Sequence, residues 1–141
     1  MGVTTDAYIR LHGMNRVLEP CDVKLHSAVT DRTGGGSNVV EKSERLYSGV
    51  ATRICFDDRE SWVIVTEKQM VLVRRNGQEV FVAAKDLKYG DRLKLSRCED
   101  PVPIDEIKHH DVTDIRMFDF GVRGGQSYVA NNVILKGEPS K

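Results

Sequence analysis

The chain has 141 residues, with 21 basic and 21 acidic side chains, and therefore carries no formal net charge. Hydrophobic residues make up 40% of it, so a packed core is expected and disorder of the chain as a whole is excluded. The balanced charge also argues against a dedicated nucleic-acid binder, which needs a positive surface to neutralise phosphates. We expect one domain that spans residues 1–141.

Three widely spaced cysteines, Cys21, Cys55 and Cys98, form no Cys-x-x-Cys pair, so the sequence does not predict a zinc site. The odd number of cysteines and the absence of a secretory signal favour a reducing, cytoplasmic compartment. No apolar run approaches the roughly 20 residues that span a bilayer, so we expect no membrane partner. We also expect no metal and no cofactor.

The first forty residues predict short strands between turns. Val3–Ile9 leads into a turn at 12–15, and 19–29 suits a short strand after its proline. Residues 31–38 have the composition of a turn or a flexible loop. The run Gly34-Gly35-Gly36-Ser37 fits a native turn and an introduced linker equally well, so composition leaves both open.

The middle of the chain is rich in β-forming residues. Val39–Tyr47 and Val50–Phe56 are predicted strands, with a break between them at Ser48-Gly49. Trp62–Thr66 is a further strand, and Trp62 is interpreted as a packing anchor beside the valines that follow it.

The clearest local signal is Asn76-Gly77 between two β-rich runs, because both central residues of a type I′ hairpin turn need a positive φ. A short helical turn is predicted over Ala83–Leu87, and a tight turn over 89–91.

The last third predicts more strands and one short connection. Ile104–Lys108 and Val112–Val122 are predicted strands, and 97–112 as a whole is expected to be a short loop region. Asn131-Asn132 is the predicted turn between strands at 127–130 and 133–135. Many short strands without a long amphipathic helix predict an all-β domain of short hairpins.

Three segments carry a family resemblance. The first is Gly2–Ile9, and the second runs through Val63–Val73 to Phe81–Leu93. The third comprises Met117–Val122 and Gln126–Gly137. In order and spacing they resemble the sequence blocks of the Hedgehog/intein family over nearly the whole chain, most specifically in 84–93 and 127–135. An unrelated β domain with similar turns is the alternative.

The resemblance implies the Hedgehog/intein all-β fold, with the two termini close together because splicing needs both junctions at one site. The connection 97–112 lies where larger inteins carry a homing endonuclease. It is too short to hold one, so the chain resembles a mini-intein.

The resemblance also assigns roles to positions of this sequence. Gly2 stands where the family has the first nucleophile, a Cys or Ser, whose acyl shift begins splicing. Thr66 matches the threonine of the second block. Gln69 replaces that block's histidine, and its amide cannot transfer a proton at neutral pH.

The C-terminal blocks show a similar mixture. Asp119 matches a family aspartate that assists acyl transfer, although a strand Asp that only pairs with a cation is an equal alternative. Its identity excludes the variant class with a Cys at this position. Gln126 replaces a histidine, and Lys136-Gly137 replaces the closing His-Asn, so no succinimide can form at Gly137. Glu138 follows, where a Cys, Ser or Thr would accept the chain.

Five family positions therefore depart from the pattern, a number that favours natural degeneration over deliberate inactivation: Gly2, Gln69, Gln126, Lys136 and Gly137. With the first nucleophile and the terminal Asn both missing, we expect no splicing and no enzyme activity. The sequence favours a splicing-inactive domain kept as a structural or interaction module of a host protein. By analogy with the family, that host would be a DNA replication or phage packaging protein.

Two other functions remain open at this stage. Thr66 and Asp119 would support residual cleavage at one junction. Contact with nucleic acid, acting through the host, would use a scattered basic set: Arg10, Arg16, Arg74, Arg75, Lys85, Lys88 and Arg92.

His109-His110-Asp111 together with Cys98 would suggest a metal site. A polar loop is the favoured interpretation of that stretch. The sequence does not predict an oligomeric state.

Overall fold

The computed structural model describes residues 2–13, 16–96, 98 and 100–137. Predictions that involve Met14, Asn15, Arg97 and Glu138 therefore fall outside the described residues.

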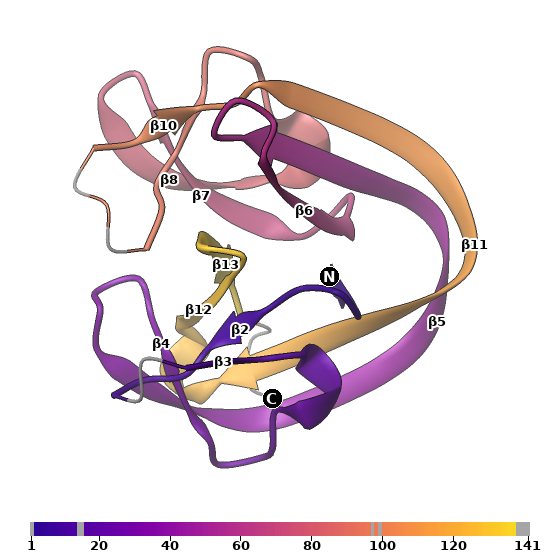
Figure 1. The fold of residues 1–141 in the computed structure, drawn as a ribbon, viewed down its shortest axis with the longest axis vertical. Helices are drawn as coiled ribbons and strands as arrows, with labels where there is room; N and C mark the ends of the chain where they lie inside the picture. Colours follow the sequence, from indigo (N-terminus) through magenta and orange to yellow (C-terminus); the bar gives the residue numbers. More distant parts are fainter. Residues whose placement is uncertain (1, 14–15, 97, 99, 138–141) are drawn as a thin grey trace.

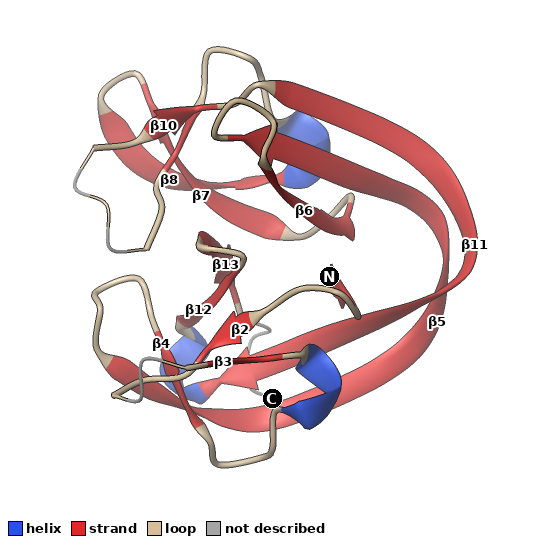
Figure 2. Cartoon of the chain, in the orientation of Figure 1, coloured by secondary structure: helices blue, strands red, loops and turns tan. Residues whose placement is uncertain are grey.

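Two long strands organise the molecule. β5 (Gly36–Phe56) and β11 (Glu106–Val122) pair antiparallel over most of their length. They form a ribbon that curves along one side and joins the two halves of the molecule (Figure 1). Short strands fill both halves, and three short 3₁₀ turns supply the helical part of the described chain (Figure 2). The predicted all-β class is confirmed.

The remaining strands have between two and six residues each. They are β1 (Val3–Thr4), β2 (Ile9–Arg10), β3 (Val17–Leu18), β4 (Ala28–Thr30), β6 (Ser61–Thr66), β7 (Met70–Arg75), β8 (Gln78–Ala83), β9 (Arg92–Leu93), β10 (Val102–Pro103), β12 (Ser127–Ala130) and β13 (Val133–Lys136). The 3₁₀ turns span Pro20–Asp22, Ala84–Asp86 and Arg123–Gly125.

These strands form two curved sheets. The first has the order β11-β1-β6-β5-β4, and β11 also pairs with β5, so four of its strands close on themselves. The second has the order β10-β9-β7-β13-β12-β2-β3, with β8 paired to β7. Val3 of β1 pairs with Phe118 of β11 on one side and with Val65 of β6 on the other. The beginning of the chain is therefore held inside the first sheet.

The predicted break at Ser48-Gly49 is a bulge within one continuous strand, so the prediction of two separate strands was wrong. Val112 lies opposite Gly49 and Ile115 opposite Tyr47, which leaves two residues of β11 facing one of β5. Asp114, in the bulge, has a φ of 53° and donates its N–H to the Ser48 hydroxyl at 3.1 Å.

The loop expected at 97–112 is shorter in the structure. The strand predicted over Ile104–Lys108 is present from Glu106, where β11 begins and pairs with β5, and Val102–Pro103 forms β10, which pairs with β9.

The segment 31–38 is an ordered hairpin connection and not a flexible loop. Gly36, Ser37 and Asn38 belong to β5 and pair with β4. Ser37 donates its hydroxyl to Asp31 at 2.8 Å, and Thr33 donates both its N–H and its hydroxyl to the same carboxylate. A Cβ on Gly36 would stand 2.5 Å from the His12 ring, so only glycine fits there. The Gly-Gly-Gly-Ser run is therefore an integral part of the fold.

The predicted hairpin turns are confirmed. Asn76 and Gly77 both have positive φ and join β7 to β8, and Asn131 and Asn132 do the same between β12 and β13. The helical turn predicted over 83–87 is present as the 3₁₀ turn Ala84–Asp86.

A buried carboxylate fixes the next turn. Asp91 accepts hydrogen bonds from Arg75 Nε and Nη2, each at 2.7 Å, and from the Lys88 N–H at 2.9 Å. Hydrogen bonding from Arg75 is the largest cause that holds the pKa of Asp91 below its ordinary value. It outweighs the burial of the carboxylate, which would raise that pKa. The Gly-Asp turn therefore anchors the end of β7, the strand that pairs with β13.

β12 is buried on both faces, whereas β6 contributes mainly one face to the core. Val63 and Val65 of β6 are fully buried, whereas Trp62 is 40% exposed. Alternate residues of a strand face opposite sides, so Trp62 points away from the valines. Its predicted role as a packing anchor was wrong. None of the described helical segments has the length and apolar character needed to cross a membrane.

Candidate functional site

The residues singled out by sequence converge around β11, and their centre comprises Gly2, Thr66, Gln69, Asp119 and Gly137. We call this set the junction centre. All five residues are buried. They come from five segments: the chain start, the end of β6, the β6–β7 turn, β11, and the residue that follows β13.

Gly2 is fixed by the end of β6. Thr66 donates its N–H to the Gly2 carbonyl at 3.0 Å, which continues the pairing of β1 with β6. The Thr66 hydroxyl is buried and has no hydrogen-bond partner among the described residues. A buried hydroxyl without a partner costs about 1–3 kcal/mol, so this hydroxyl, on a residue whose backbone binds Gly2, is the kind of exception seen at functional sites.

Asp119 faces the position where Gly2 lacks a side chain. A Cβ on Gly2 would stand 3.0 Å from Asp119 Oδ1 and 3.3 Å from the Phe118 carbonyl oxygen. Arg45 of β5 donates its Nε to Asp119 Oδ2 at 3.2 Å, and the carboxylate is only 7% exposed. Asp119 is thus a strand carboxylate that is both paired with a cation and directed at the chain start. The pairing with a cation is confirmed, and a role in acyl transfer stays a prediction.

Gln69 binds the other end of the junction centre. Its Nε2 donates to the Lys136 carbonyl at 2.9 Å and to the Met70 carbonyl at 3.1 Å, which uses both amide hydrogens. Its backbone N–H donates to the Thr66 carbonyl at 3.0 Å. Gln69 therefore ties the β6–β7 turn to the peptide bond between Lys136 and Gly137.

Gly137 is enclosed by backbone. Its N–H donates to the Gln126 carbonyl at 2.9 Å. A Cβ at this position would stand 2.7 Å from the same carbonyl oxygen and 3.2 Å from the Phe120 carbonyl oxygen. Real Cβ atoms do not approach backbone oxygen so closely, so any larger residue here requires the backbone to shift.

Two of the predicted site residues contribute only main-chain groups. The Gln126 side chain is exposed, and only its carbonyl takes part. The Lys136 ammonium lies over the Phe81 ring, 5.9 Å from the ring centroid, while its carbonyl accepts the hydrogen bond from Gln69. Neither side chain can take over the role of the histidine that it replaces in the family pattern.

The two ends of the described chain lie against the same strand. Gly2 is next to the Phe118 carbonyl and Gly137 is next to the Phe120 carbonyl. Carbonyl groups two residues apart on a strand point to the same side and are about 7 Å apart. The expected proximity of the two ends is confirmed.

The chemistry available in the junction centre is limited. Gly2 offers no nucleophile, Gln69 offers a neutral amide, and Gly137 has no side-chain amide that could cyclise. The remaining groups are a carboxylate paired with Arg45 and one hydroxyl. They can orient and polarise a peptide bond, but they do not supply the nucleophile that an acyl shift needs.

Several other predicted features lie outside this centre. His109, His110 and Asp111 belong to β11 and not to a polar loop, and adjacent side chains on a strand face opposite sides. They therefore do not converge on a metal. Among the described residues, the one group whose ligand atoms come close together is the exposed set Glu19, Cys21 and Asp22.

The basic set named from the sequence is not a uniform patch. Arg75 is committed to Asp91, whereas Arg74 and Arg92 sit exposed on adjacent strands.

Sequence reasoning missed Arg45. It lies 74 residues before Asp119, and only the pairing of β5 with β11 brings the two together. No local pattern marks it.

No protein-family model matches the chain, and no curated protein matches it either. Solved structures do match. The chain is similar to a DnaB intein from Synechocystis sp. PCC 6803, with a TM-score of 0.80, 15% identity, and coverage of 97% of this chain and 98% of that one. It is similar to a bacterial intein-like domain from Clostridium thermocellum, with a TM-score of 0.78, 18% identity, and coverage of 98% and 99%.

A third match is the gp41-1 intein, with a TM-score of 0.74, 17% identity, and coverage of 97% of this chain and 98% of that one. At these identities the likeness is one of fold. The chain has the Hedgehog/intein fold over nearly its whole length.

Proposed function

We propose that this Hedgehog/intein-fold domain does not splice and serves as a structural or interaction module inside a host protein. The observation that carries the proposal is the packing at Gly137. The position where an intein ends in Asn is closed by the Gln126 and Phe120 carbonyl oxygens, so a side chain has no room. The chain therefore lacks the carboxamide at this position, and the surrounding backbone also leaves no space for one.

The rest of the junction centre supports the same conclusion. Gln69 spends both amide hydrogens on carbonyl groups, so it acts as a tie between segments and not as a proton donor to a scissile bond. The proximity of Gly2 and Gly137 on β11 would let the domain enter and leave a host chain at one point. A domain with adjacent ends can occupy a surface loop of another protein without unfolding it.

The test is an insertion experiment. The full chain is inserted into a surface loop of a reporter enzyme, and the purified fusion is incubated with and without dithiothreitol. We expect an active reporter and, by mass spectrometry, the intact mass of the fusion in every sample. A ligated reporter that has lost the domain would overturn the proposal, and an unfolded reporter would overturn the insertion-module part.

Residual cleavage at the N-terminal junction is the second candidate. The Asp119 carboxylate stands at Gly2, and Thr66, whose N–H binds the Gly2 carbonyl, has a buried hydroxyl without a hydrogen-bond partner among the described residues. The atoms nearest to a Cβ on Gly137 are two carbonyl oxygens and a Val122 methyl group. If cleavage occurs, its product should break immediately before Gly2, and the double variant T66V/D119N should abolish it. Cleavage after Gly137 would contradict this assignment.

A further inference from the structure

A cleft outside the junction centre has the features of a binding site. It has a volume of about 340 Å³ and lies between the start of β6, β2 and the β12–β13 turn. Two aromatic side chains line it, Tyr8 and Trp62, and none of the residues of the junction centre does. The volume falls within the range of ordinary ligand pockets, about 300–1,000 Å³.

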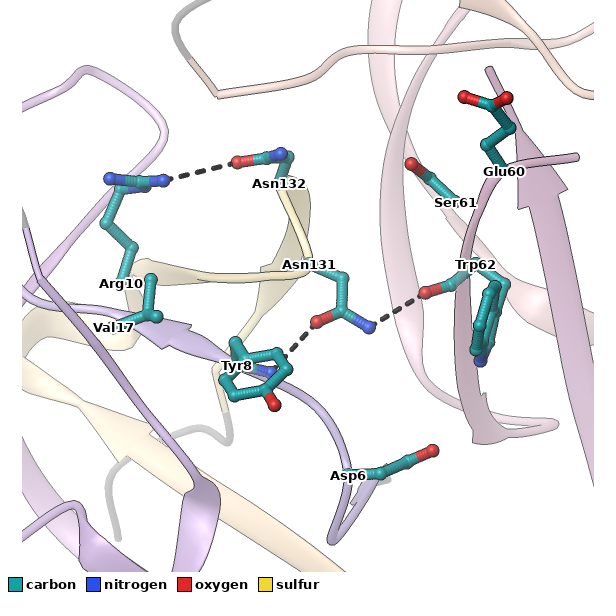
Figure 3. Close-up of a pocket in the computed structure, with 9 residues that line it drawn as sticks. All are labelled: Asp6, Tyr8, Arg10, Val17, Glu60, Ser61, Trp62, Asn131 and Asn132. Atoms are coloured by element: carbon teal, nitrogen blue, oxygen red, sulfur yellow. Dashed lines mark hydrogen bonds between the residues drawn. The ribbon is translucent and has the colours of Figure 1, made fainter. Parts of the chain in front are cut away.

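A single asparagine forms the centre of the cleft and ties its two sides together. The Asn131 carboxamide oxygen accepts the Tyr8 N–H at 2.9 Å, and its amide group donates to the Trp62 carbonyl at 2.8 Å (Figure 3). The Asn131 N–H also donates to the Tyr8 carbonyl at 3.0 Å. Figure 3 shows Tyr8 and Trp62 on either side of Asn131. The backbone at Tyr8 and at Trp62 is thus held in place by hydrogen bonds to Asn131.

Both rings that line the cleft are exposed. Tyr8 is 52% exposed and Trp62 is 40% exposed, although both belong to or adjoin strands whose other faces are buried. Arg53 already places its guanidinium 5.2 Å from the centroid of the Trp62 ring. Arg53 does not line the cleft, so its contact with the indole leaves the part of the ring that lines the cleft accessible to a ligand. Within the molecule, the Trp62 ring therefore already makes a cation–π contact with a guanidinium group.

The charges at the cleft are divided between its two sides. Figure 3 shows Arg10 beside Asn132, whose side-chain oxygen accepts a weak hydrogen bond from it at 3.5 Å. Asp6 and Glu60, both exposed, also line the cleft, and Figure 3 shows Glu60 above Trp62 and Asp6 below it. The cleft thus joins two π faces to two carboxylates, which suits a cation and opposes a phosphate.

We propose that this cleft binds the basic side chain of a peptide segment, an arginine or lysine that lies between Tyr8 and Trp62. Asp6 and Glu60 balance its charge, and the polar groups of Ser61 and Asn132 are available to its backbone. The site goes beyond the module role. It shares no residue with the junction centre, so it stands or falls independently of whether the chain splices.

A binding experiment tests the proposal with a spectroscopic signal located at the site. Trp62 is the only tryptophan of the chain, so the indole N–H gives one assignable NMR cross-peak. A tetra-arginine peptide, a tetra-glutamate peptide and an octathymidylate are titrated separately into the full chain. We expect the tetra-arginine peptide to shift this cross-peak saturably, and the shift to weaken at high salt because exposed charges are screened.

Variants separate the cleft from general charge. Tyr8→Ala and Glu60→Gln should each weaken the affinity for the tetra-arginine peptide about fivefold. Tyr89→Ala and Asp111→Asn remove an equally exposed ring and acid elsewhere, and should leave the affinity unchanged. An equal shift with tetra-glutamate, a tighter site for the oligonucleotide, no saturable shift, or equal loss in the control variants would each overturn the proposal.

Discussion

The two glycines at the ends of the described chain differ in what surrounds them. A side chain on Gly2 would first meet the tip of Asp119, a flexible group that can rotate away, with a Phe118 carbonyl oxygen at 3.3 Å. A side chain on Gly137 would meet the Gln126 carbonyl oxygen at 2.7 Å, which moves only if the backbone moves. Both positions lack the side chain that the family pattern has there, but only the second is closed by main chain.

If the domain is the non-splicing module that we propose, this difference implies that the two halves of the splicing chemistry were lost in different ways. At the N-terminal end a group is missing from surroundings that still hold Thr66 and Asp119. At the C-terminal end the backbone of β11 and of the segment before β12 has taken the space. Introducing a side chain should therefore destabilise the protein less at Gly2 than at Gly137. Substitutions at the two positions can measure this difference in the free energy of unfolding.

The largest effect is expected for Gly137→Asn. The new side chain must displace the Gln126 carbonyl, which also accepts the Gly137 N–H, so overpacking should destabilise the protein by about 1–3 kcal/mol. Urea denaturation followed by circular dichroism gives the change. Gly90→Asn is the matched control, because a Cβ at Gly90 would meet nothing within 4 Å. A Gly137→Asn variant as stable as the control would show that the C-terminal end is not closed.

Gln69→Leu tests the tie that holds this closed end. The substitution keeps the approximate volume but removes both donors to the Lys136 and Met70 carbonyl groups. Buried acceptors that lose a partner cost about 1–3 kcal/mol, and the loss should appear in the same denaturation assay. Gln126→Leu changes an exposed side chain of the same type and should stay within about 0.5 kcal/mol of the parent. Equal effects would contradict the role of Gln69.

Acid should weaken the turn that anchors β7, the strand that pairs with β13. Hydrogen bonding from Arg75 keeps the pKa of Asp91 below its unfolded value, so the folded state binds fewer protons there than the unfolded state. This contribution is complete above the unfolded pKa of about 3.9 and is lost as the pH falls through the lower folded value. Denaturation curves from pH 7 to pH 3 should show a shallower loss for Asp91→Asn than for the parent. An identical dependence of stability on pH in the two proteins would contradict this role of Asp91.

Local features were predictable from the sequence because their causes are local. Asn76-Gly77 and Asn131-Asn132 need positive φ whatever surrounds them, and the structure has both turns. The bulge at Ser48-Gly49 depends on one extra residue in β11, more than sixty positions away, so it looked like a strand break. The loop at 31–38 was misjudged because its order comes from Asp31 and His12, and not from glycine content.

The site shows the same division. The family resemblance proposed the identities of its members, and the structure brings Gly2, Thr66 and Asp119 together. The closing contacts could not be proposed. Carbonyl groups of Gln126 and Phe120 have no sequence signature, and neither does the pairing of Arg45 with Asp119.

The smallest effect is expected for Gly2→Cys, which completes the comparison. Asp119 can turn about its own side-chain bonds to admit the new Cβ, while the main-chain contact at 3.3 Å needs to relax by a few tenths of an ångström. The cost should therefore stay below about 1 kcal/mol, less than that of Gly137→Asn.

Denaturation of Gly2→Cys and Gly137→Asn side by side, with Gly90→Cys as the control for the introduced thiol, measures the difference directly. The stable Gly2→Cys protein also allows a chemical test, because its thiol would stand beside Asp119. With an upstream reporter attached, dithiothreitol should release that reporter if the N-terminal surroundings still support an acyl shift, and no ligated product should form because Gly137 cannot cyclise. Gly2→Cys that destabilises the protein as much as Gly137→Asn would remove the asymmetry between the two ends.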